Sequence, residues 1–124
     1  MINSTDEQEL KKTAKKNLAE KIDADCKFST PLPLNTAQAM IDIFSDYYET
    51  YKTYTVPYSE FIDKYFKKEE KAHSFSYHKT EINKMVKASI DKMKEANYIR
   101  YTDCTMGLAV VPKKDFRKSL KELL

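Results

Sequence analysis

Apolar residues recur every three or four positions between residues 76 and 96, which is the spacing of one face of a helix. This face consists of Ile82, Met85, Val86, Ser89, Ile90 and Met93. Two short segments of alternating polarity follow, residues 98–102 and 108–111, separated by a polar turn that holds the only glycine of the chain, Gly107. Asn97 suits the left-handed position that ends a helix. The pattern therefore predicts a long helix followed directly by a β-hairpin.

Upstream, two more helical patterns enclose a short strand. Asn35 is placed to cap a helix that runs to about Tyr51, and its apolar positions follow the helical period. Residues 52–56 are β-prone, and residues 58–71 return to a helical pattern. A single short strand must pair with another strand, and the hairpin is the only candidate. We therefore expect a small antiparallel sheet.

Both ends of the chain add a helix. Residues 5–22 carry a thin apolar stripe, formed by Leu10, Ala14, Leu18 and Ile22, which is typical of a peripheral helix or a dimer contact. Pro31 and Pro33 predict an extended linker after it. Residues 113–124 return to a helical pattern, with Phe116, Leu120 and Leu123 on one side.

The expected fold class is mainly α with a small antiparallel sheet, an α+β fold. We expect three parts: residues 1–34 as an N-terminal helix and proline-containing linker, residues 35–112 as the main domain, and residues 113–124 as a C-terminal helix.

From Asn35 onward the order is helix, strand, helix, helix, hairpin, helix, and this order resembles the winged helix-turn-helix superfamily. In that superfamily the first strand pairs beside the wing. The resemblance implies that residues 76–96 are the recognition helix and residues 98–112 the wing, and that the protein binds DNA. It also implies dimerisation through helices outside the core.

Composition and charge indicate the kind of partner and the cellular compartment of the protein. The 124 residues carry a net charge of +3, but residues 74–124 hold eleven basic against six acidic residues. This bias indicates either a polyanionic partner or an ordinary lysine-rich surface. Cys26 and Cys104 lie far apart and are interpreted as free thiols of a reducing compartment. The chain shows neither a membrane span nor a signal peptide, so we expect a cytoplasmic protein.

The polar face of the residue 76–96 helix is the candidate DNA-binding surface, because asparagine can bridge adenine and lysine can meet guanine or phosphate in a major groove. The alternative is an ordinary exposed helix face. Arg100, Lys113 and Lys114 would extend the basic edge, whereas the predicted hairpin turn carries neither Lys nor Arg. The candidate DNA contacts are Lys79, Thr80, Asn83, Lys84, Lys87, Lys94, Arg100, Lys113 and Lys114.

A protein-binding role is the alternative hypothesis. Nine tyrosines and no tryptophan are present, and an exposed patch of Tyr47, Tyr51 and Tyr54 would anchor a protein partner. Tyrosine more often packs at the edge of a core with its hydroxyl in water, so both interpretations stay open. The terminal helices could pair two copies of the chain, or they could pack on their own domain. The residues for such a contact are Leu10, Leu18, Phe116 and Leu120.

Catalysis and cofactor binding find little support in the sequence. His73 and His78 are five residues apart and do not align on one helix face, and no spacing typical of a metal site occurs. We therefore expect no enzyme, metal, cofactor or small-molecule substrate. The favoured hypothesis is a double-stranded DNA-binding homodimer, acting as a regulator or as a replication, partition or transfer accessory of a mobile element. The alternatives are a winged-helix protein-interaction module and an RNA binder.

Overall fold

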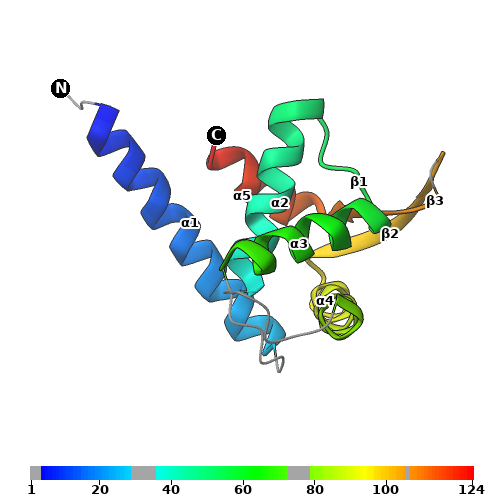
Figure 1. Cartoon of the computed structure of the whole chain (residues 1–124). Helices are drawn as coiled ribbons and strands as arrows, with labels where there is room; N and C mark the ends of the chain where they lie inside the picture. Colours follow the sequence, from blue (N-terminus) through cyan, green and yellow to red (C-terminus); the bar gives the residue numbers. More distant parts are fainter. Residues whose placement is uncertain (1–3, 29–35, 73–78, 106) are drawn as a thin grey trace.

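The computed structural model describes residues 4–28, 36–72, 79–105 and 107–124. These residues form α1 (Ser4–Cys26), α2 (Thr36–Tyr51), β1 (Val56–Pro57), α3 (Tyr58–Ala72), α4 (Lys79–Glu95), β2 (Ile99–Cys104), β3 (Gly107–Pro112) and α5 (Lys114–Glu122) (Figure 1). The fold is mainly helical with one small antiparallel sheet, which confirms the expected α+β class. The predicted cap Asn35 and the prolines Pro31 and Pro33 lie outside the described residues.

Helix α2 is the centre of the core. Both sides of its apolar stripe are covered, because α1, α3 and α5 all pack against it. Phe44 is fully buried, with its ring centroid 5.3 Å from that of Phe61 on α3 and 5.7 Å from that of Phe116 on α5. A helix that meets neighbours on several sides must be apolar around most of its circumference. The buried residues of α2 are Thr36, Ala37, Ala39, Met40, Ile41, Ile43, Phe44 and Tyr47.

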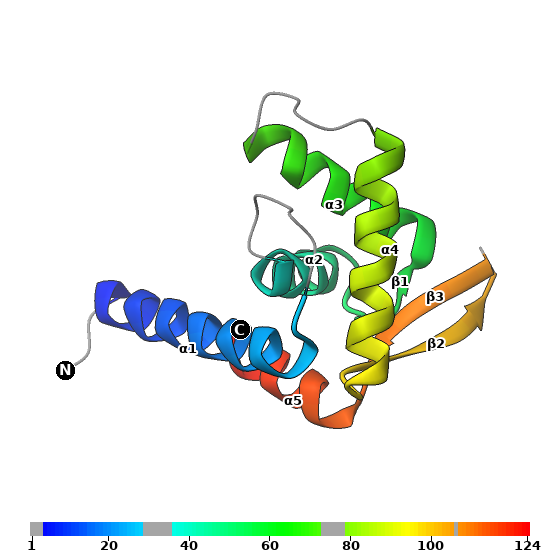
Figure 2. The ribbon, with the colours of Figure 1, turned by 90° about the horizontal axis from the view of Figure 1, so that it is seen from below.

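Only the C-terminal half of α1 belongs to this core. Ala19, Ile22 and Cys26 are buried, whereas the described side chains from Gln8 to Ala14 are exposed. Figure 2 shows the N-terminal half of α1 extending away from the other elements. The thin apolar stripe is therefore buried near Ile22 and exposed to solvent at its N-terminal end.

Polar contacts hold the end of α1 against α4 and β2. The Tyr98 hydroxyl donates a hydrogen bond to the Asp25 carboxylate, and Lys92 Nζ on α4 donates to the carbonyl oxygen of Lys27 at 2.9 Å. Burial, followed by this contact with Asp25, raises the pKa of the Tyr98 hydroxyl. The expectation of a peripheral helix therefore applies to the first half of α1 only.

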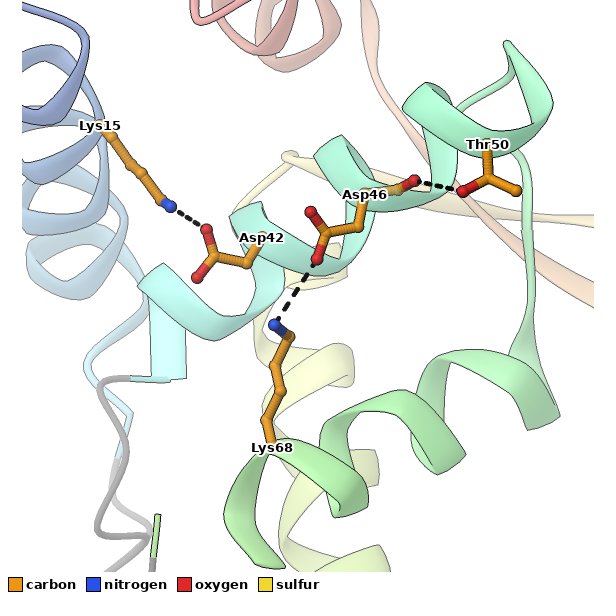
Figure 3. Close-up of polar contacts among 5 residues, drawn as sticks. All are labelled: Lys15, Asp42, Asp46, Thr50 and Lys68. Carbon is orange, nitrogen blue, oxygen red and sulfur yellow. Dashed lines mark hydrogen bonds and ion pairs between the residues drawn. The ribbon is translucent and has the colours of Figure 1, made fainter. Parts of the chain in front are cut away.

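Two ion pairs join α2 to its neighbours on either side (Figure 3). Lys15 of α1 pairs with Asp42, and Lys68 Nζ of α3 lies 3.7 Å from Asp46 Oδ2. One helical turn along, the Thr50 hydroxyl donates to the backbone oxygen of Asp46 at 3.2 Å. Partly exposed ion pairs contribute little stability, about 0–1 kcal/mol each, so they orient the helices that the apolar core holds together.

The sheet has the order β1-β3-β2, with all neighbours antiparallel. β1 is only two residues long, pairing Val56 with Val110 and Pro57 with Ala109. Residues 52–56 were expected to form the strand, but Lys52 has a positive φ of 59° that ends α2, and the backbone N–H of Thr55 donates to Thr53 Oγ1. The left-handed Lys52 and this local hydrogen bond keep the first residues of the segment out of the strand.

The helix-to-hairpin junction follows the prediction. Asn97 has a φ of 67°, and the backbone N–H of Tyr98 donates to the carbonyl oxygen of Met93 at 3.0 Å. This is the left-handed helix ending that Asn accepts more readily than most residues. In the described part of the chain, no helix is long and apolar enough to cross a membrane.

Candidate nucleic-acid interface

Helix α4 places four of the expected DNA contacts on its solvent face. Thr80, Lys84, Lys87 and Lys94 are all exposed, and their spacing of three, four and seven residues keeps them on one side. The opposite side carries the buried Val86, Ser89, Ile90 and Met93, and the buried Ser89 hydroxyl donates to the backbone oxygen of Met85 at 2.9 Å. The side chain of Lys79 lies outside the part that the structure describes.

Asn83 differs from these four residues. It is half-buried, and its Oδ1 atom is buried without a hydrogen-bond partner among the described residues. A bidentate contact to adenine needs both the oxygen and the nitrogen of the amide at the helix surface. The Asn83 oxygen is not at the helix surface in this conformation, so the predicted base contact requires a different orientation of the side chain.

Lys94 is exposed, and its ammonium group also lies over an aromatic ring of the sheet. Its Nζ lies 5.0 Å from the centroid of the Tyr101 ring on β2. The Tyr101 hydroxyl in turn donates to Asp91 Oδ1 at 2.6 Å, and the Tyr58 ring meets Tyr101 edge-on at 5.8 Å. Burial, followed by the hydrogen bond to Asp91, raises the pKa of the Tyr101 hydroxyl. This cluster connects α4 and the start of α3 to the hairpin.

The charge on the solvent face of α4 is mixed. Lys84, Lys87 and Lys94 are accompanied by three exposed acids, Glu81, Asp91 and Glu95. The lysines in the middle of the helix, Lys84 and Lys87, are free of ion pairs and hydrogen bonds among the described residues. These two residues therefore form the part of α4 best suited to meet a phosphate.

A more basic surface lies on α5 and the sheet. One hollow of about 600 Å³ is lined by Asn97, Arg100, Pro112, Lys113, Lys114, Asp115 and Arg117. A second hollow, of about 290 Å³, is lined by Tyr48, Lys52, Thr53, Tyr54, Thr55, Val111, Arg117 and Lys121. Arg117 borders both hollows. The expected contacts Arg100, Lys113 and Lys114 are thus brought together here and not alongside Lys84 and Lys87.

Lys113 is partly engaged in holding this region together. Its Nζ donates to Asn97 Oδ1 at 3.1 Å, and its backbone N–H donates to the carbonyl oxygen of Tyr98 at 2.8 Å. Sequence reasoning missed Lys52 and Lys121 as members of this surface. The spacing of Lys114, Arg117 and Lys121 along one helix face was a usable signal, whereas the position of Lys52 depends on tertiary packing alone.

The three tyrosines of the alternative hypothesis do not form the expected exposed patch. Tyr47 and Tyr54 are 9% and 5% exposed, and only Tyr51 is largely exposed, at 59%. The ring of Tyr54 stacks on that of Tyr48 with centroids 4.5 Å apart, and Tyr47 packs beside Tyr51 at 4.5 Å. Two of the three rings are therefore buried, which removes the main support for a tyrosine anchor.

The residues expected to pair two copies of the chain differ in their exposure. Phe116 and Leu120 are buried in the core of their own domain, because α5 packs its apolar side on α2. Their burial favours the alternative in which the C-terminal helix packs on its own domain. Leu18 is half-buried against the same core, and Leu10 remains exposed at 61%. A single exposed leucine on α1 is ordinary for a protein surface.

No family model, curated protein or solved structure matches the chain. His73 and His78, the two histidines weighed for metal binding, lie outside the described residues.

Proposed function

We propose that residues 36–112 form a winged-helix domain and that the protein binds double-stranded DNA, with α4 as the helix that enters the major groove. Two features support the winged-helix assignment. The elements follow the order expected of that superfamily, and β1 pairs with β3, beside the hairpin that would be the wing.

The observation that carries the proposal is the solvent face of α4. Thr80, Lys84 and Lys87 project from one side of a helix whose other side is anchored in the core, and the hairpin follows immediately. An anchored helix with a free polar face is what insertion into a groove about 12 Å wide requires. Lys84 and Lys87 would contact phosphates and release counterions, which gives affinity independent of sequence.

The test is fluorescence anisotropy with a labelled duplex of about 30 base pairs, roughly three helical turns. The protein should bind with micromolar affinity that falls steeply between about 50 and 200 mM salt. Charge reversal at both Lys84→Glu and Lys87→Glu should weaken binding at least tenfold and make the salt slope shallower by about 2, one for each lost phosphate contact.

A matched control is Lys11→Glu with Lys12→Glu, because both lysines are exposed on the projecting half of α1 and the change in net charge is the same. This variant should lose much less affinity than the α4 variant. Equal losses in the two variants would mean that only net charge matters and that α4 makes no specific contact. Circular dichroism should show unchanged helix content in both.

A protein-binding function is the second candidate, and the hairpin favours it. The hairpin segment from Thr102 to Gly107 contains neither Lys nor Arg, and Leu108 is 44% exposed beside it. A wing that reads a minor groove usually presents a basic side chain there. If the protein does not bind the duplex even at low salt, the hairpin would be the first surface to test for a protein partner.

A further inference from the structure

We infer that the protein holds a second segment of double-stranded DNA through a surface separate from α4. This surface, called the α5 surface below, comprises Lys52, Arg100, Lys114, Arg117 and Lys121. The inference rests on the proposed function, since it assumes that α4 binds one duplex, and it adds that the protein bridges two.

The α5 surface exists because α5 is anchored on one side only. Phe116 and Leu120 are buried, and the Phe116 ring meets Phe44 at 5.7 Å and Tyr98 at 5.5 Å, in both cases edge-on. With those two residues facing inward, Lys114, Arg117 and Lys121 must face outward. All three are exposed.

Two elements distant in sequence complete the surface. Arg100 on β2 pairs with Val111 on β3, and it borders the 600 Å³ hollow with Lys114 and Arg117. Lys52 ends α2 with a left-handed backbone and borders the 290 Å³ hollow with Arg117 and Lys121. Because Arg117 borders both, the two hollows are adjacent. Each hollow is lined by at least three cations, and Asp115 is the one acid in the two linings.

The charge of this surface exceeds that of α4. The exposed acids of α5 are Asp115 and Glu122, against the five cations of the surface and the further exposed Lys118. On α4 the described exposed lysines and acids are equal in number. A surface on which cations outnumber acids suits the repeated phosphates of a nucleic-acid backbone, which are bound by charge without reading of base sequence.

The position of the α5 surface separates it from the face of α4 that carries Lys84 and Lys87. Figure 1 shows α4 on one side of the sheet, with α5 and the C-terminal end of α2 on the other. A straight duplex lying along α4 therefore does not pass over Lys52 and Lys121. If both surfaces bind DNA, they bind different segments.

A two-colour capture assay tests this inference. One duplex is biotinylated and immobilised on beads, a second duplex carries a fluorophore, and the full-length protein is added at low salt. The wild-type protein should bind the beads and capture the fluorescent duplex. Arg117→Glu with Lys121→Glu should remain on the beads through α4 but capture at least fivefold less of the second duplex. The Lys11→Glu and Lys12→Glu control should capture it as the wild type does.

The outcomes separate this inference from the proposed function. Wild-type protein on the beads without capture, or full capture by the Arg117 and Lys121 variant, would overturn the inference alone. Absence of protein from the beads would refute DNA binding as a whole. The Lys84→Glu and Lys87→Glu variant should stay on the beads through the α5 surface and lose capture. If that variant does not bind at all, the α5 surface does not hold DNA and the inference fails. If it captures fully, α4 is not the binding helix.

Discussion

Replacing Ile22 by alanine tests whether α1 is part of the core. Ile22 is fully buried where α1 meets the rest of the domain, and the change removes three carbon atoms. At about 0.8 kcal/mol for each buried carbon, the lost transfer free energy is about 2.4 kcal/mol. The cavity adds to it, so we expect a loss of about 3 kcal/mol in the free energy of unfolding, within the usual range of roughly 2–5 kcal/mol.

The matched control is Leu10→Ala on the same helix, since Leu10 is 61% exposed. That change should alter the free energy of unfolding by less than about 0.5 kcal/mol. Urea denaturation followed by circular dichroism measures both values, and the Ile22→Ala variant should also lower Tm by roughly 10 °C. A loss below about 0.5 kcal/mol for Ile22→Ala would refute the docking of α1. An equally large loss for Leu10→Ala would show that the projecting half has a partner in solution.

Further predictions concern Cys26, Gly107 and Tyr101. Burial, together with the nearby carboxylates, raises the pKa of Cys26 from 9.0 to about 11. A thiol reagent at pH 8 should therefore label Cys104 in the native protein and Cys26 only after unfolding. Because the folded pKa of Cys26 is the higher one, its contribution to stability is present below pH 9.0 and is lost as pH rises from 9.0 towards 11, which urea titrations at several pH values should show. Gly107 has a φ of 104°, and a Cβ added there would meet no other atom within 4 Å. Gly107→Ala should therefore lower the free energy of unfolding by about 1–2 kcal/mol through backbone strain alone. Tyr101→Phe removes the hydrogen bond to Asp91 and should cost about 0.5–1.5 kcal/mol in the same assay, while spectrophotometric titration should lose one tyrosine that ionises above the ordinary pKa.

Local sequence patterns were sufficient for the elements themselves. The helical spacing of residues 79–95, the left-handed Asn97 and the hairpin each depend on neighbours within a few positions, and all three are present in the structure. The two strands are longer than predicted, because their pairing continues to Cys104 and Gly107. The pairing of β1 with the hairpin was also predictable, because a lone strand needs a partner. The length of β1 was not predictable, because the hydrogen bond from Thr55 to Thr53 competes with strand pairing.

Exposure of individual side chains was decided by tertiary packing. Periodicity fixes the direction in which a side chain leaves its helix, but not whether another element lies there. Thus α5 and α3 cover opposite sides of α2, Tyr54 stacks on Tyr48, and Phe116 becomes a core residue.

For the same reason, the predicted DNA-binding residues lie on two surfaces instead of one. The sequence determined that the C-terminal half is basic and that α4 has a polar face. Only the tertiary structure turned the Asn83 oxygen inward, brought Lys94 over Tyr101, and placed Lys52 beside Arg117, residues that are 65 positions apart. Charge along a chain is a local property, whereas the surface a partner meets depends on which elements the core brings together.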